Sequence, residues 1–70
     1  MAIRVGVWGA GAWGEKHARV YAASPQAELV GIYDRRPERT REIAARHGVR
    51  AFERPEALLA ACAAVSIAVP

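Results

Sequence analysis

Three glycines near the start of the chain are spaced as in loops that bind a diphosphate. Gly9, Gly11 and Gly14 fit the pattern G-x-G-x-x-G and follow an apolar run at residues 3–8. The first glycine of such a loop permits a tight turn, the second lets a diphosphate approach the backbone, and the third allows close packing of helix and strand. The N–H groups at the start of the next helix then face the anion. The pattern needs a preceding strand, a following helix and a later acid to become specific.

An acidic residue stands at the required distance. Asp34 lies 20 residues after Gly14, at the end of a second apolar run. A carboxylate there can accept hydrogen bonds from both hydroxyls of an adenosine ribose and would repel a 2′-phosphate, which favours NAD over NADP. The alternative is a turn aspartate that caps the next helix. Arg35 could stack on the adenine or attract a 2′-phosphate, which keeps NADP possible, or it could simply be exposed.

Apolar runs and turn residues predict strands that alternate with helices. The expected strands are residues 3–8, 27–33, 49–52 and 64–69, and the expected helices are residues 12–23, 37–47 and 55–61. This alternation calls for an α/β fold with a parallel sheet. A Rossmann-type sheet has the strand order 3-2-1-4, and its ligand crevice opens above strands one and four.

Helical spacing also predicts which side chains face the sheet. The expected sheet-facing residues of the first and third helices are Trp13, His17, Val20, Tyr21, Leu58 and Leu59, whereas Glu15 is expected in solvent. The fourth strand is apolar and would be an open edge, which invites pairing with another chain. We therefore expect further chain or a partner subunit to cover it.

Composition restricts the function further. Seventy residues make at most one small domain, and nine of the ten basic residues are arginines interspersed with glutamates, which argues against nucleic-acid binding. Cys62 is the single cysteine, expected as a small buried residue, and its spacing from His17 and His47 predicts no metal site. No apolar run is long enough for a membrane span. The N-terminus leads directly into a strand rather than a signal peptide, so a cytoplasmic protein is expected.

Four sequence blocks resemble the N-terminal part of the Gfo/Idh/MocA family of oxidoreductases. The blocks are V-G-V-W-G-A-G-A-W-G-E-K-H-A-R, L-V-G-I-Y-D-R-R-P-E-R, H-G-V-R-A-F and A-V-S-I-A-V-P. They cover nearly all of the chain in the order and spacing of the family. The resemblance implies a pyridine-nucleotide dehydrogenase that acts on sugars, cyclitols or related polyols.

The resemblance also implies residue roles. The diphosphate loop corresponds to Gly9, Gly11, Ala12, Trp13 and Gly14, the ribose and adenine contacts to Asp34 and Arg35, and the strand end that lines the cofactor cleft to Val69 and Pro70. In the family the catalytic lysine, an aspartate/histidine pair and the mostly β substrate domain come later in the chain. Residues 1–70 are therefore expected to be the first portion of a dinucleotide-binding domain, inactive alone and without catalytic residues. The alternative is a non-catalytic nucleotide-binding or scaffolding module that docks on a partner subunit.

Overall fold

The apolar runs pair as four parallel strands in the order β3-β2-β1-β4. The computed structural model describes residues 2–68. Its elements are β1 (Ile3–Trp8), α1 (Ala12–Ala23), β2 (Ala27–Tyr33), α2 (Pro37–His47), β3 (Arg50–Ala51), α3 (Pro55–Ala61) and β4 (Ala64–Ile67). The predicted fold class and strand order are confirmed. The third and fourth strands are shorter than predicted, and the predicted end of the fourth strand, Val69 and Pro70, lies outside the described residues.

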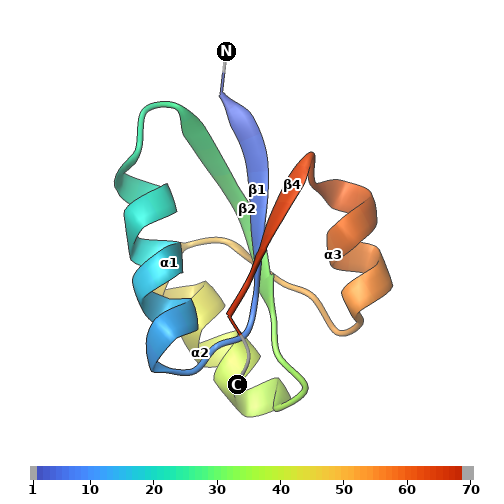
Figure 1. Ribbon diagram of the computed structural model, residues 1–70. Helices are drawn as coiled ribbons and strands as arrows, with labels where there is room; N and C mark the ends of the chain where they lie inside the picture. Colours follow the sequence, from blue (N-terminus) through green and yellow to red (C-terminus); the bar gives the residue numbers. More distant parts are fainter. Residues whose placement is uncertain (1, 69–70) are drawn as a thin grey trace.

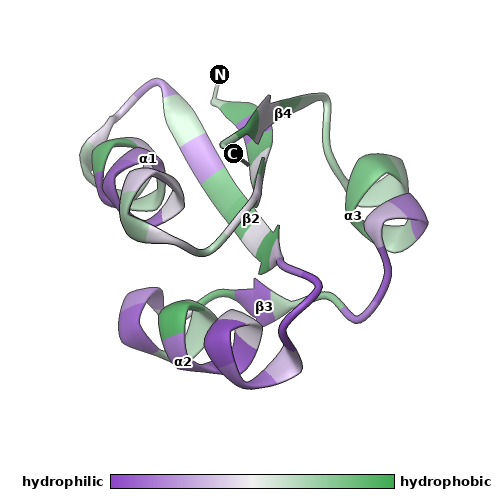
Figure 2. Cartoon of the chain, turned by 60° about the horizontal axis from the view of Figure 1, so that its bottom comes forward, coloured by the Kyte–Doolittle hydropathy of each residue, from purple (hydrophilic) through white to green (hydrophobic). Residues whose placement is uncertain are grey.

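Helices cover both faces of the sheet. Helices α1 and α2 lie together on one face, and α3 lies on the other (Figure 1). The core between the sheet and the α1–α2 layer is built from Val7, Ala10, Ala18, Ile32 and Ile43. The exposed side of α2 is strongly hydrophilic, whereas the strands are mostly apolar (Figure 2). This matches a buried parallel sheet with helices that are solvated on their outer sides.

The orientation of α1 differs from the hydrophobic pattern. Trp13 and Val20 are 68% and 64% exposed, so the prediction that they face the sheet is wrong. Gly14 and Ala18 are buried instead. Because the third glycine of the loop must lie against the end of β1, it determines which side of the helix faces inward. Trp13, one residue before Gly14, then lies about 100° away from it around the helix, and Val20, six residues after it, lies about 120° away.

Two further side chains differ from prediction. Leu58 is fully buried under the sheet, but Leu59 is half exposed on the outer side of α3. Glu15 is not freely solvated, because its carboxylate pairs with Arg39 and Arg46 of α2. These ion pairs join α1 to α2 beside the glycine loop.

Strand β4 forms one edge of the sheet within the described residues. Among residues 2–68 it pairs with β1 alone, and Ile67 at its end is 63% exposed. Cys62, just before β4, is partly buried and lies close to Gly6 of β1. Across residues 2–68, no helix has the length and apolar character needed to cross a membrane.

Candidate functional site

The carboxyl ends of three strands meet at one end of the sheet. The N–H of Gly9, just after β1, donates to the carbonyl oxygen of Tyr33 at the end of β2 (2.7 Å). The N–H of Ala68, just after β4, donates to the carbonyl oxygen of Trp8 (2.8 Å). The glycine loop, Asp34 and Ala68 are thus brought to one place, where parallel sheets of this kind bind ligands.

Two of the three motif glycines are required by the packing of the loop itself. Gly9 has φ +125°, and a Cβ built on it would lie 2.7 Å from the carbonyl oxygen of Ala68. A Cβ on Gly14 would overlap the carbonyl oxygen of Gly9. The turn after β1 and the contact between α1 and β1 therefore both exclude a side chain.

Gly11 has a different environment. Within the part of the chain that the structure describes, a Cβ on Gly11 would have one neighbour within 4 Å, the Nη2 atom of Arg36 at 3.8 Å. Gly11 is the N-cap of α1 and offers the helix no side-chain cap, so the first N–H groups of the helix stay available to an anion. It opens onto a groove of about 540 Å³ that is lined by Gly11, Ala12, Trp13, His17, Asp34, Arg36 and Ala68. The space at Gly11 suits a ligand that approaches the backbone.

Asp34 is one of the residues that line this groove. Its Oδ2 accepts the N–H of Ala10 (2.7 Å), and its Oδ1 accepts the backbone N–H of Arg36 (2.9 Å). The Arg36 guanidinium also donates two hydrogen bonds, from its Nε–H to Oδ1 (3.0 Å) and from its Nη2–H to Oδ2 (3.3 Å). Asp34, the residue predicted to bind the ribose, is therefore also part of the structure of the glycine loop. Helix α2 has Arg36 as its N-cap, so the alternative of Asp34 as the capping residue is not the geometry found.

These contacts lower the pKa of Asp34. Partial burial acts to raise it, but hydrogen bonds from the Arg36 side chain, the Ala10 N–H and the Arg36 N–H outweigh burial and bring it from 3.8 to about 2. The Asp34 side chain is only 10% exposed, but the Arg36 side chain is 59% exposed, so solvent screens the contribution of the guanidinium. Asp34 is an anion at any pH near neutrality, as a ligand for hydroxyl donors should be.

The lowered pKa predicts a loss of stability in acid. Because the folded-state pKa lies below the unfolded value, the ionised carboxylate contributes stability that is complete above about pH 4 and is lost as the pH falls towards 2. The contribution is about 1–2 kcal/mol once solvent screening of the exposed Arg36 guanidinium is allowed for. Urea unfolding between pH 5 and pH 2 should show a decline smaller by about that amount in Asp34→Asn than in the natural protein. Equal declines would contradict the assignment.

Two residues that the sequence analysis did not single out hold the loop and Asp34 in place. The guanidinium of Arg39 donates through Nε to the carbonyl oxygen of Ala10, whose N–H is bound by Asp34. The Thr40 hydroxyl, almost fully buried, accepts the N–H of Asp34 (2.9 Å) and lies 2.8 Å from its carbonyl oxygen. Both residues sit one turn into α2, at positions that a spacing rule for the glycine loop does not include.

Thr40→Val is expected to lower the free energy of unfolding by about 1–3 kcal/mol. Valine has nearly the same shape, but it leaves the N–H of Asp34 without its acceptor. Thr40→Ser keeps the hydroxyl and serves as the matched control. Chemical denaturation of both variants tests this, and similar losses in the two would assign the effect to packing rather than to the hydrogen bond.

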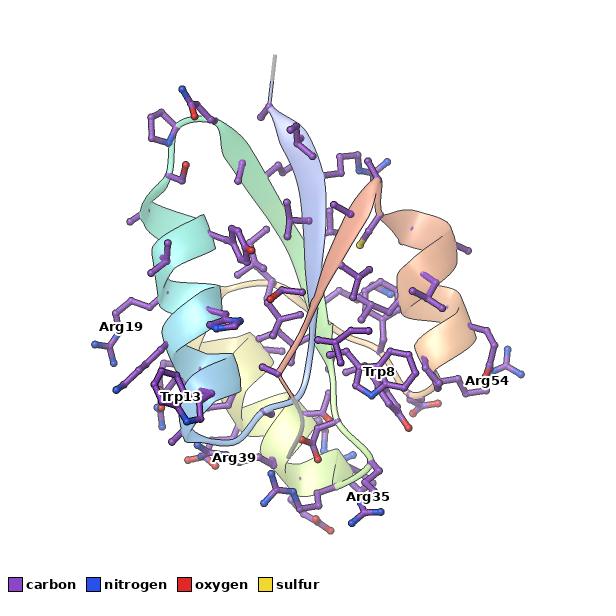
Figure 3. The ribbon with its side chains drawn as sticks, in the orientation of Figure 1. Trp8, Trp13, Arg19, Arg35, Arg39 and Arg54 are labelled. Carbon is purple, nitrogen blue, oxygen red and sulfur yellow. The ribbon has the colours of Figure 1, made fainter. Side chains whose placement is uncertain are left out.

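The two tryptophans that flank the loop have separate environments. Trp8 lies on the α3 side of the sheet and packs edge-to-face on Tyr33, with ring centroids 5.6 Å apart. Trp13 lies on the opposite side, at the groove, with the Lys16 ammonium 4.8 Å from its ring (Figure 3). Trp8 is therefore a packing residue, whereas Trp13, which is 68% exposed, lines the groove.

Arg35 and His17 lie in different parts of the site. Arg35 is exposed and lines a second cavity, of about 240 Å³, beside Tyr33 and Phe52 rather than the groove. His17 faces the sheet as predicted, and its Nδ1 lies 2.7 Å from the hydroxyl of Ser66 in β4. No group of three or more metal-binding side chains occurs among residues 2–68.

A parallel sheet in this order, with a glycine loop and an acid at its carboxyl ends, defines the dinucleotide-binding class of Rossmann domains. Comparison with known proteins agrees. The Gfo/Idh/MocA family model, described as an oxidoreductase family with an NAD-binding Rossmann fold, matches residues 3–70. The chain belongs to this family.

Three similar proteins illustrate the relationship. The UDP-N-acetylglucosamine 3-dehydrogenase of Acidithiobacillus ferrooxidans is 47% identical over 68 residues, which are 97% of this chain and 21% of that protein. Its crystal structure, 44% identical, superposes with a TM-score of 0.94 over 100% of this chain and 23% of its own. A myo-inositol dehydrogenase from Corynebacterium glutamicum is 32% identical (TM-score 0.89, 100% and 22% covered). GenD2 from gentamicin A biosynthesis, in complex with NAD, is 31% identical (TM-score 0.92, 99% and 20% covered). The chain thus spans about a fifth of the length of these relatives.

Proposed function

We propose that the groove binds the adenosine diphosphate half of NAD. The diphosphate would lie over the open side of Gly11, at the N-terminus of α1, and the adenosine ribose would bind Asp34. The observation that carries this proposal is the carboxylate of Asp34, held 2.7 Å from the N–H of Ala10 inside the glycine loop, on the lining of a groove into which Gly11 projects no side chain. NADP is the alternative cofactor, and it is considered below.

The same proposal assigns the remaining contacts. Gly9 and Gly14 shape the loop, while Ala12 and Trp13 line the groove beside the diphosphate. Arg35 would contact the adenine from the neighbouring cavity. Val69 and Pro70 lie outside the described residues, and for them we keep as a proposal the role that the family resemblance implies, at the cofactor cleft.

We further propose that the protein containing this domain is a dehydrogenase of sugars, cyclitols or related polyols. The relatives act on a UDP-linked sugar and on myo-inositol. The bound cofactor would supply a hydride acceptor at nicotinamide C4, so that a carbinol could be oxidised to a ketone with loss of its hydroxyl proton to a base. We assign that base to none of residues 1–70. We regard these residues as the first portion of a domain, without the substrate-binding part.

The exposed edge of β4 supports the proposal that another part of the whole protein, or a partner, covers this strand. An apolar edge strand that ends in an exposed isoleucine is prone to pair with other chains. We infer that further strands or a partner subunit cover it, and a non-catalytic module docked through β4 is the second candidate function. A free cysteine and a dinucleotide cofactor both suit a cytoplasmic location.

The test uses the full-length product of the gene. Calorimetric titration with NAD and with NADP measures binding, and the absorbance of reduced nicotinamide measures hydride transfer from myo-inositol, UDP-N-acetylglucosamine and other polyols. Binding of NAD with hydride transfer supports the dehydrogenase. Binding without transfer from any polyol favours the docking module, and binding of neither nucleotide overturns the proposed site.

A further inference from the structure

The carboxylate of Asp34 has no free acceptor position in this structure. Oδ1 accepts the Nε–H and the backbone N–H of Arg36, and Oδ2 accepts the Nη2–H of Arg36 and the N–H of Ala10. An ionised carboxylate offers about four lone-pair sites in all. Ribose hydroxyls that donate to Asp34 must therefore displace a group of this chain that already donates to it.

The Arg36 side chain is the group that can leave. The two backbone N–H groups belong to the glycine loop and the β2–α2 turn, which the fold holds in place. The Arg36 side chain is 59% exposed, and the two hydrogen bonds that its guanidinium makes to other residues in the range 2–68 both go to Asp34. Exposed ion pairs of this kind contribute little free energy, so a ligand can replace one.

The displaced guanidinium would remain beside the ligand. Arg36 lines the same groove as Gly11, and its Nη2 lies 3.8 Å from the position of a Cβ on Gly11. A phosphate on the ribose 2′-oxygen would enter next to Asp34, where it meets the guanidinium. Arginine binds phosphate through two parallel N–H bonds. Arg35 lines the neighbouring cavity, which Asp34 also lines, but it does not line the groove.

We propose that Arg36 determines the discrimination between NAD and NADP, because it competes with the ribose hydroxyls for Asp34 and supplies a cation for a 2′-phosphate. This inference rests on the proposed dinucleotide site. Arg36 thereby weakens the preference for NAD that Asp34 alone would create.

The experiment measures the dissociation constants of NAD and NADP by calorimetry, at one salt concentration, in the full-length protein and in Arg36→Gln. We expect NAD to bind roughly twofold to fivefold more tightly in the variant, since a weak competitor is gone. We expect NADP to bind at least about tenfold more weakly, since a charge-assisted contact to phosphate is gone. Arg19→Gln removes the same charge from an exposed position on α1 and is the matched control (Figure 3).

Two further variants keep the result interpretable. Arg36→Lys retains the charge without the paired N–H geometry, and we expect it to bind NADP more tightly than Arg36→Gln does. If Arg35→Gln shifts the ratio of the two constants and Arg36→Gln does not, or if Arg36→Gln matches Arg19→Gln, the inference is overturned and the proposed site stands. If the natural protein binds neither nucleotide, the proposed site fails and this inference fails with it.

Discussion

Gly14→Ala is expected to destabilise the domain by about 3 kcal/mol, enough to unfold much of a small domain of marginal stability. The added methyl group would overlap the carbonyl oxygen of Gly9, so α1 must move away from the end of β1. Alanine in place of an exposed helical glycine would instead stabilise the helix by about 1 kcal/mol. The sign of the effect in urea unfolding therefore reports the contact between helix and strand.

Gly11→Ala is the matched control for that substitution. It adds the same methyl group to the same loop, but the nearest atom is 3.8 Å away and the backbone is extended. We expect its free energy of unfolding to stay within about 1 kcal/mol of the natural protein, the cost of alanine as an N-cap. Its affinity for NAD should nevertheless fall, because the methyl group occupies the side on which the diphosphate approaches. Equal destabilisation by both substitutions would refute the separate roles of the two glycines.

The sequence alone could predict part of this structure. The glycine spacing and the apolar runs were sufficient for the element order, the strand order and the position of Asp34. The orientation of α1 was predicted wrongly because Trp13 and Val20 are strongly apolar and were placed inward. Gly14 was the better signal, because a residue that must touch the strand backbone fixes the rotation of the helix about its axis. Ala18, four residues later, then lies on the same buried side of the helix.

The partners of Asp34 could not be predicted by spacing alone. Arg35 and Arg36 are neighbours of the same type, and the direction of each side chain depends on the β2–α2 turn. Arg39 reaches the Ala10 carbonyl only because α1 and α2 lie on the same face of the sheet, which brings residues 29 positions apart into contact. Such contacts follow from tertiary packing, so they appear only once the strands and helices are assembled.

Asp34→Asn is expected to weaken NAD binding by roughly tenfold to a hundredfold, the effect of losing a charged acceptor of hydrogen bonds. The asparagine oxygen can still accept the N–H of Ala10, so the loop should keep its form. Calorimetry with NAD measures the loss. Glu38→Gln, which removes an equal charge from an exposed position in the first turn of α2, is the control and should leave the affinity unchanged.

The response of NADP to the same substitution tests the site more sharply. Asp34→Asn removes the anion that repels a 2′-phosphate, and it also frees the guanidinium of Arg36 from its partner. NADP affinity should therefore rise while NAD affinity falls. If the rise depends on Arg36, the double variant Asp34→Asn/Arg36→Gln should lose it, and the two substitutions will not be additive. Additive effects would mean that the carboxylate acts on the 2′-phosphate by repulsion alone.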